Sequence, residues 1–170
     1  INMYGQAKLM GENEIIKYCK KYIILRTSWV FSDHPDNFVQ TILMHAKDKN
    51  SLSIISDQIG NPTSTYGIAS ALVNIIPNLD GAMGIYNFSE YPEVSWATFA
   101  SSIIRQANDI GLLDKRINIV NINSSQYPTK AARPKNSSLC TEKFNIKFGF
   151  KPNSWEDSLK LVLTKIKNNK

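Results

Sequence analysis

Two side chains near the start of the sequence have the types and the spacing for proton transfer. Tyr4 and Lys8 lie four residues apart, which places a phenol and an ammonium group one above the other on the same face of a helix. A cation beside a phenol stabilises the tyrosinate form, and such a phenol can exchange a proton with a substrate oxygen. The same spacing occurs on many surface helices, so an ordinary surface pair is the alternative interpretation.

An arginine far along the chain has the chemistry to bind phosphate. Arg133 lies in the segment 123–138, in which polar residues dominate and no apolar periodicity is visible. Its planar guanidinium can offer two parallel donors to phosphate oxygens. Such a segment is typical of a functional loop or a linker, and a solvent-exposed arginine is the alternative for Arg133.

The hydrophobic pattern predicts the elements that must position these residues. Helical spacing and capping residues predict helices over 4–21, 38–47 and 66–76, after Ser95, near 141–145 and after Ser154. Runs of β-branched and aromatic residues predict buried strands over 22–31, 52–56, 85–88 and 117–122. This alternation favours an α/β or α+β architecture over an all-helical bundle.

A glycine-rich phosphate-binding turn is missing from the sequence. No G-x-G-x-x-G or G-x-x-G-x-x-G motif follows a predicted strand. That motif supplies the turn and helix start that bind the pyrophosphate of a dinucleotide. We therefore expect that the chain cannot build the usual dinucleotide site by itself.

The composition is that of an ordinary globular protein, with 42% hydrophobic and 20% charged residues and no apolar run long enough for a membrane helix. The formal net charge of +6 suits a phosphate-bearing small molecule. The lysines are scattered and no nucleic-acid-binding motif accompanies them, so nucleic acid is not expected as a partner. Cys19 and Cys140 belong to no cluster, and His34 and His45 lack metal-ligand spacing. These patterns predict a reducing, cytoplasmic location and no metal site.

Five stretches of the sequence resemble the dTDP-4-dehydrorhamnose reductases, a branch of the extended short-chain dehydrogenase/reductase superfamily. They are Tyr4-Gly5-x-x-Lys8-x-x-Gly11-Glu12, Arg26-Thr27-Ser28-Trp29-Val30, Asn37-Phe38, Asp57-Gln58-x-Gly60-x-Pro62-Thr63, and Tyr127-Pro128-Thr129-x-Ala131-x-Arg133-Pro134-x-Asn136-Ser137. The stretches 57–63 and 127–137 are far more specific than the Tyr/Lys pair. The resemblance covers only the family's carboxy-terminal portion, so we expect a piece of a longer enzyme that lacks its amino-terminal half.

The resemblance implies roles for residues on the cofactor side of the site. Tyr4 resembles the general acid that protonates the C4 oxygen of the sugar. Lys8 resembles the lysine that holds the nicotinamide ribose and favours the tyrosinate. Thr27 and Ser28 match the turn that passes the nicotinamide, with simple burial as the alternative.

The resemblance also implies residues on the substrate side. Trp29 matches an aromatic residue that faces the substrate, with a core tryptophan as the alternative. Asn37, Phe38 and Gln58 are expected to frame the nucleotide base or ribose, while a helix cap, a core ring and a turn amide are their alternatives. Arg133 is expected to bind the diphosphate.

The fold that the resemblance implies is α/β, with the carboxy-terminal part of a Rossmann-like parallel sheet and a smaller α/β substrate-binding lobe. Residues 1–56 are expected to end the dinucleotide-binding domain. Residues 57–170 are expected to form mainly the substrate-binding lobe, with returning elements. Trp96 and Trp155, each at a predicted helix start, are expected to anchor the core and are assigned no further function.

The implied reaction of the longer enzyme is reduction of dTDP-4-dehydro-L-rhamnose to dTDP-L-rhamnose with NADPH or NADH, and the chain alone is expected to be inactive. Its expected partners are a nucleotide-diphosphate sugar, the missing amino-terminal half and, as an open possibility, further copies of itself. One alternative is a non-catalytic regulatory subunit of the methionine adenosyltransferase type. Another is a sugar-nucleotide epimerase or dehydratase on a similar scaffold.

Overall fold

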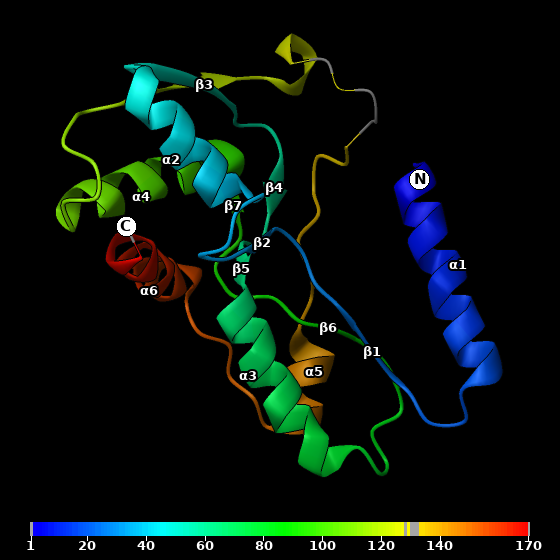
Figure 1. The fold of residues 1–170 in the computed structure, drawn as a ribbon. Helices are drawn as coiled ribbons and strands as arrows, with labels where there is room; N and C mark the ends of the chain where they lie inside the picture. The colour runs from blue at the N-terminus through cyan, green and yellow to red at the C-terminus, as the bar shows by residue number, and fades with distance from the viewer. Residues whose placement is uncertain (1, 128, 130–132, 170) are drawn as a thin grey trace.

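Helices and short strands alternate along the chain in the computed structural model, which describes residues 2–127, 129 and 133–169 (Figure 1). The helices are α1 (Met3–Tyr18), α2 (Phe38–Asp48), α3 (Thr65–Ile75), α4 (Trp96–Asp109), α5 (Glu142–Phe148) and α6 (Trp155–Asn168), with the 3-10 turns η1 (Ile76–Asn78) and η2 (Ser124–Gln126). The strands are β1 (Ile23–Arg26), β2 (Val30–Phe31), β3 (Ser51–Ile55), β4 (Ile59–Gly60), β5 (Thr63–Ser64), β6 (Gly84–Asn87), β7 (Val94–Ser95) and β8 (Asn118–Ile122). The predicted α/β class is confirmed.

The strand pairs join segments that are far apart in the sequence. β1 pairs in parallel with β6, β2 with β5, and β3 with β8, whereas β4 and β7 are antiparallel. The longest of these ladders, β3 with β8, runs in register from Ser51 opposite Asn118 to Ile55 opposite Ile122. A parallel pair needs a long crossover connection, and here helices α3 and α4 lie in the intervening chain.

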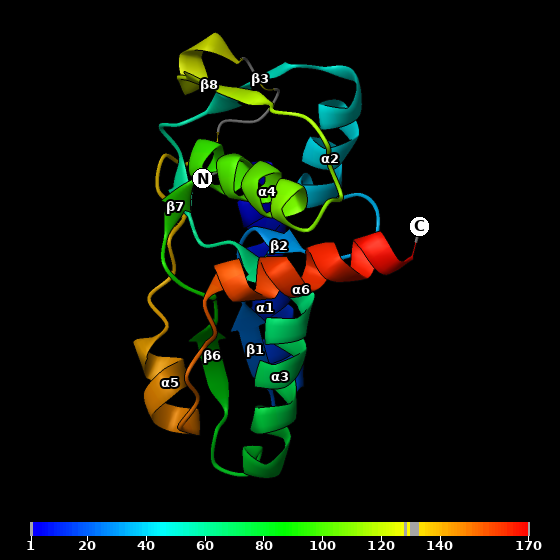
Figure 2. The same ribbon diagram turned by 90° about the vertical axis from the view of Figure 1, so that its left-hand side faces the viewer.

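Two hydrophobic clusters hold these elements together, and Figures 1 and 2 show them as an upper and a lower part of the molecule. The upper cluster joins α2, β3, α4 and α6. Its largest fully buried members are Phe31, Ile42, Phe99, Ile103, Trp155, Leu159 and Leu163. The lower cluster joins α3, β6 and α5 through Ala71, Ile75, Ala82, Tyr86, Phe88, Phe144 and Phe148. Burial of such apolar side chains contributes roughly 1.5–3 kcal/mol each.

The chain passes repeatedly between these clusters. β1 belongs to the lower part, α2 and β3 to the upper, α3 and β6 to the lower, α4 and β8 to the upper, α5 to the lower and α6 to the upper (Figure 2). Strand β3 (51–55) lies before the expected domain boundary at residue 56, yet it pairs with β8, which lies after that boundary. The division into domains 1–56 and 57–170 stays a prediction.

One predicted strand is wrong in its extent. The run 22–31 is not continuous but breaks into β1 and β2, because Trp29 between them has a φ of 43°. A left-handed backbone cannot continue a strand. The helices after Ser95 and Ser154 begin where the sequence predicted them, and the helix predicted over 66–76 begins one residue earlier, after Ser64. Each of these serine oxygens accepts a hydrogen bond from a backbone N–H of the first turn.

Helix α1 makes little contact with the rest of the chain and lies beside β1 (Figure 1). The carboxylate of Glu12 accepts a 2.8 Å hydrogen bond from Nε of Arg26 at the end of β1. None of the residues of this helix is buried. Several large apolar side chains on it are exposed instead, namely Met3, Tyr4, Leu9, Met10, Ile15, Ile16 and Tyr18.

A buried carboxylate links the lower and upper parts of the molecule. Glu90 is fully buried, and its oxygens accept hydrogen bonds from the Ser64 backbone N–H at 2.9 Å, the Ser64 hydroxyl at 2.9 Å and the Ser158 hydroxyl at 2.6 Å. Ser64 begins α3 and Ser158 lies on α6, so Glu90 joins the two helices. Burial raises the pKa of Glu90, and these hydrogen bonds only partly offset that effect.

The raised pKa of Glu90 predicts a pH-dependent contribution to stability. A carboxyl whose pKa is higher in the folded state stabilises the fold most below its ordinary value near 4.5, and this stabilisation is lost as pH rises through the raised pKa. Glu90→Gln does not titrate. The free energy of unfolding of the native chain should therefore fall relative to that of Glu90→Gln as pH rises from about 4 to about 8.

Urea denaturation of both proteins across this pH range measures the effect. Glu93→Gln is the matched control, because Glu93 is an exposed carboxylate close to Glu90 in the sequence. A difference between native chain and Glu90→Gln that stays constant with pH would contradict the prediction.

Candidate substrate-binding site

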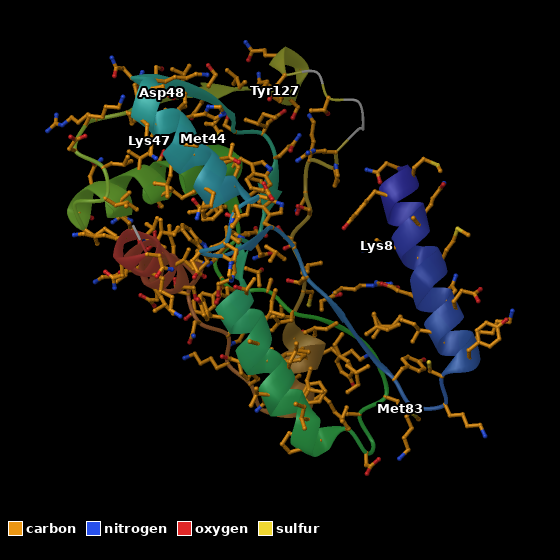
Figure 3. The ribbon with its side chains drawn as sticks, viewed as in Figure 1. Lys8, Met44, Lys47, Asp48, Met83 and Tyr127 are labelled. Atoms are coloured by element: carbon orange, nitrogen blue, oxygen red, sulfur yellow. The ribbon has the colours of Figure 1, made fainter. Side chains whose placement is uncertain are left out.

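A cavity of about 740 Å³ lies between one face of α2, the strand β3 and the loop that follows β8. Its lining from α2 and the preceding turn is Asp36, Asn37, Phe38, Thr41, Ile42, His45 and Lys49, and from β3 and beyond it is Ser51–Ile55 and Gln58. Trp96, Tyr127, Thr129 and Arg133 complete it. Figure 3 shows Tyr127 near the carboxyl end of β8, beside the upper part of the molecule.

The cavity collects four of the five residues predicted for the substrate side. Asn37, Phe38, Gln58 and Arg133 all line it, although they come from three segments far apart in the sequence. The fifth, Trp29, is not among the lining residues. Whether these four side chains contact a ligand stays a prediction.

The charges around this cavity favour an anionic ligand. Lys49 and Arg133 are exposed cations in the lining. Asp36 is the one carboxylate among the lining residues that the structure describes. The positive charges of this lining therefore outnumber the negative ones, which favours binding of a phosphate group.

Asn37 and Phe38 also have structural roles at the start of α2. The Oδ1 atom of Asn37 accepts hydrogen bonds from the backbone N–H groups of Val39 and Gln40, so this side chain caps the helix. Its Nδ2 donates to two carbonyl groups of the preceding turn. The ring of Phe38 lies 4.5 Å from that of Trp96, centroid to centroid, and 5.6 Å from that of Phe99. The rings of Trp96 and Phe99 thus hold Phe38 in place where it lines the cavity.

Gln58 connects the turn after β3 with the turn after β8. It is buried, and its Nε2 donates a 3.0 Å hydrogen bond to the Ser124 hydroxyl. The neighbouring Asp57 accepts from the Ser124 backbone N–H at 2.8 Å and from its hydroxyl at 2.6 Å. These hydrogen bonds hold the pKa of Asp57 below its ordinary value. The pair thereby fixes η2, and with it Tyr127 at the edge of the cavity.

Trp96 has a place in both the core and the cavity wall. It is half-buried and packs against the upper cluster, as expected of a core anchor, and it also lines the cavity. Trp29 stacks on it with ring centroids 3.5 Å apart and an angle of 8° between the planes. Trp155, in contrast, is 1% exposed and donates through Nε1 to the Pro92 carbonyl, which confirms its core role.

The predicted cofactor-side residues Thr27 and Ser28 follow the carboxyl end of the parallel strand β1. Thr27 is exposed, and the half-buried Ser28 donates a 2.9 Å hydrogen bond through its hydroxyl to the Asn61 carbonyl. Ligands of parallel α/β sheets bind at the carboxyl ends of the strands. The two residues therefore lie where a nicotinamide ring could pass, and their cofactor role stays a prediction.

Tyr4 and Lys8 lie one above the other on α1, as their spacing predicted. The Lys8 Nζ atom is 5.5 Å from the centroid of the Tyr4 ring, and Tyr4 is 70% exposed. Figure 3 shows Lys8 on the side of α1 that faces the rest of the chain. Neither residue lines the cavity, so the expected general acid and the expected substrate pocket come from separate surfaces of this chain.

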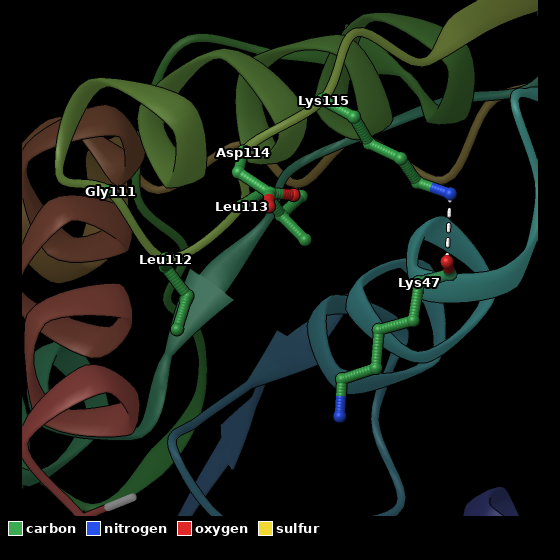
Figure 4. A pocket seen from close by; sticks show the side chains of 6 residues that line it. All are labelled: Lys47, Gly111, Leu112, Leu113, Asp114 and Lys115. Atoms are coloured by element: carbon green, nitrogen blue, oxygen red, sulfur yellow. Dashed lines mark hydrogen bonds between the residues drawn. The ribbon is translucent and has the colours of Figure 1, made fainter.

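A second, smaller cavity of about 340 Å³ lies between the end of α2 and the loop after α4 (Figure 4). It is lined by Lys47, Gly111, Leu112, Leu113, Asp114 and Lys115. Lys115 Nζ donates a 2.7 Å hydrogen bond to the Lys47 carbonyl, so this lysine closes the end of α2 (Figure 4). None of the predicted site residues lines this cavity.

Within 2–127, 129 and 133–169, no three His, Cys, Asp or Glu side chains lie close enough together to hold a metal ion. No helix in the same ranges has the length and apolar character to cross a bilayer.

Comparison with known proteins gives a consistent result over the whole chain. Residues 1–168 match the family described as the RmlD substrate binding domain. The dTDP-4-dehydrorhamnose reductase of Aggregatibacter actinomycetemcomitans is 40% identical over 165 residues, which are 94% of this chain and 56% of that protein. That of Escherichia coli K12 is 34% identical over 98% of this chain and again 56% of the relative. The chain thus spans about half the length of the curated relatives that it matches.

Solved structures show the same relationship. The dTDP-4-dehydrorhamnose reductase of Bacillus anthracis, crystallised with NADP, is 29% identical with a TM-score of 0.89 and covers 97% of this chain, which covers 56% of it. The corresponding protein of Clostridium acetobutylicum gives a TM-score of 0.88 at 29% identity, over 96% of this chain and 55% of that one. A UDP-glucuronic acid 4-epimerase of Bacillus cereus, at 20% identity and a TM-score of 0.75, shares the fold.

Proposed function

This chain belongs to the RmlD substrate binding domain family, and from that premise we propose that it is the substrate-binding part of a reductase that converts dTDP-4-dehydro-L-rhamnose to dTDP-L-rhamnose with NADPH or NADH. The observation that carries the proposal is the convergence of Asn37, Phe38, Gln58 and Arg133 on one cavity. In this reading, Arg133 binds the diphosphate through its planar guanidinium, and the aromatic and amide groups frame the nucleoside.

The cofactor-side residues fit a nicotinamide cofactor in chemistry and placement. Thr27 and Ser28 lie at the carboxyl end of a parallel strand, and Lys8 carries an ammonium group that can donate to a ribose hydroxyl. The cofactor, when bound, supplies a hydride for the C4 carbon of the sugar. Tyr4 donates the proton that the C4 oxygen then needs, and Lys8 beside the ring stabilises the tyrosinate left behind.

For this chemistry, the surface of α1 that carries Tyr4 and Lys8 and the substrate cavity have to act on the same sugar. We propose that α1 packs against the part of the enzyme that precedes it and carries the glycine-rich turn. The exposed apolar side chains of α1, such as Leu9, Ile15 and Ile16, support this proposal because a surface helix seldom exposes so many.

Self-association of the enzyme and a cytoplasmic location belong to the same proposal. The free, exposed thiols of Cys19 and Cys140 support a reducing compartment.

The test is a turnover assay of the full-length enzyme with dTDP-4-dehydro-L-rhamnose and NADPH or NADH. We expect consumption of the reduced cofactor in step with formation of dTDP-L-rhamnose. A regulatory subunit would bind ligands without turnover, and an epimerase or dehydratase would change the sugar without net consumption of cofactor; either result would overturn the proposal. The 170-residue chain on its own is the control, and without a glycine-rich turn it should not consume cofactor.

A further inference from the structure

Trp29 is held in place by residues that are distant in the sequence. Its backbone is left-handed, with φ 43°, and its carbonyl accepts a 3.2 Å hydrogen bond from the Thr63 backbone N–H. A bulky residue in this conformation needs support from its surroundings, because the conformation costs free energy on its own. The indole is half-buried and lies flat on Trp96.

Gly60 provides the space for the edge of this indole. A Cβ atom at position 60 would lie 2.4 Å from Cε2 and 2.6 Å from Nε1 of Trp29, and 2.7 Å from the Ser137 hydroxyl. These distances are far below van der Waals contact. The backbone of β4 and the Trp29 ring can therefore approach this closely only because position 60 has no side chain.

The hydroxyl of Ser137 completes the contact. It accepts a 3.1 Å hydrogen bond from Nε1 of Trp29 and donates a 3.1 Å hydrogen bond to the Ile59 carbonyl. The hydroxyl thus acts both as a hydrogen-bond acceptor and as a donor, and these two hydrogen bonds orient it toward the indole. The backbone N–H of Ile59 also donates a 2.8 Å hydrogen bond to the Lys135 carbonyl, which lies on the same segment as Ser137.

Ser137 lies four residues after Arg133 on one continuous segment, while Trp29 directly follows Ser28. The hydrogen bond between Trp29 and Ser137 is therefore a direct link between the segment that carries the cavity arginine and the turn at the end of β1. Trp96, which stacks on Trp29, lines the cavity itself. One small side chain thus connects the segment of Arg133 with the turn that carries Thr27 and Ser28.

We propose that Ser137 is a positioning residue, whose hydroxyl holds the Trp29 indole against Gly60 and Trp96 and so couples the Arg133 segment to the turn of Thr27 and Ser28. The coupling part of this inference rests on the proposed function, since it needs a ligand that Arg133 binds. The positioning part does not.

The test is hydrogen exchange at the Trp29 indole N–H, followed by NMR in the full-length enzyme with 15N-labelled tryptophan. The Trp29 signal is assigned by its loss in Trp29→Phe. Ser137→Ala removes the acceptor, and Gly60→Ala displaces the ring, so each should speed this exchange about 5-fold or more. Ser138→Ala is the matched control, because the Ser138 hydroxyl is buried and has no hydrogen-bond partner in the described part of the chain.

The second arm adds dTDP as the probe. In the native enzyme, dTDP should slow exchange at Trp29, and in Ser137→Ala this response should be lost while dTDP binds only about 3-fold more weakly. Unchanged exchange in both Ser137→Ala and Gly60→Ala, or equal acceleration in Ser138→Ala, would overturn the positioning role. A dTDP response that persists in Ser137→Ala would overturn the coupling. Absence of dTDP binding by the native enzyme would instead count against the proposed function, and exchange without ligand would still decide the role of Ser137.

Discussion

Replacement of Tyr4 by phenylalanine should lower the kcat of the full-length enzyme about 100-fold or more, while the Kd for dTDP barely changes. The substitution removes the hydroxyl that we propose as the proton donor to the C4 oxygen of the sugar and leaves the aromatic ring in place. Because Tyr4 lies on α1 and does not line the cavity, nucleotide binding should not depend on its hydroxyl. Steady-state kinetics and calorimetric titration with dTDP measure the two effects separately.

The chain offers a matched control for this experiment on the same helix. Tyr18 is 69% exposed, close to the 70% of Tyr4, and Lys17 Nζ lies 4.7 Å from the centroid of its ring. Tyr18→Phe therefore removes a similarly exposed phenol beside an even closer cation and should leave kcat unchanged. If Tyr4→Phe retained the native kcat, Tyr4 would be an ordinary surface residue and the proposed proton donor would be wrong.

Arg133→Ala should weaken binding of dTDP by about 2 to 4 kcal/mol, or roughly 30- to 1,000-fold in Kd. The physical reason is the loss of two charge-assisted hydrogen bonds from a planar group to phosphate oxygens. Arg133→Lys should recover only part of the affinity, because an ammonium group supplies the charge without the paired donors. Calorimetry with dTDP measures each Kd directly.

Lys135→Ala is the control for charge alone. Lys135 is an exposed cation two residues away on the same segment, and it does not line the cavity. Its removal lowers the net charge by the same unit and should change the Kd for dTDP by less than about 2-fold. Equal Kd values for the native enzyme and Arg133→Ala would show that the Arg133 guanidinium is exposed to solvent and does not bind the phosphate groups.

Local signals made much of the fold predictable. Helices α2, α3, α4 and α6 follow an asparagine or serine whose side chain caps the first turn, and each then presents apolar residues at helical spacing. Such signals lie within a few residues of each other, so they can be recognised without knowing what the helix packs against. The same reasoning placed β3, β6 and β8 to within one or two residues.

The features that escaped prediction depend on contacts between distant segments. The break at Trp29 needs the close approach of Gly60 and the hydroxyl of Ser137, and neither is visible in the apolar run 22–31. The two-residue strands β4, β5 and β7 are likewise too short to leave a pattern.

Knowledge of the family supplied most of the candidate site. Asn37, Phe38, Gln58 and Arg133 entered through motifs, and the structure then brought them to one cavity. For Trp96 only the core role was predicted, because an aromatic residue at the first position of a helix is typical of a core anchor. In the cavity wall it packs against Phe38, which lies in a different part of the sequence.

The alternation of the chain between the upper and lower clusters has a consequence for how the molecule folds. Neither cluster is a continuous stretch of sequence, since α5 completes the lower one and α6, the last helix, completes the upper one. A chain emerging from the ribosome could not finish the lower cluster before residues 142–148, or the upper cluster before residues 155–168, had been made. The strand pairs also join distant segments, such as β1 with β6 and β3 with β8, which favours slow folding and a single cooperative transition over stepwise assembly of two independent units.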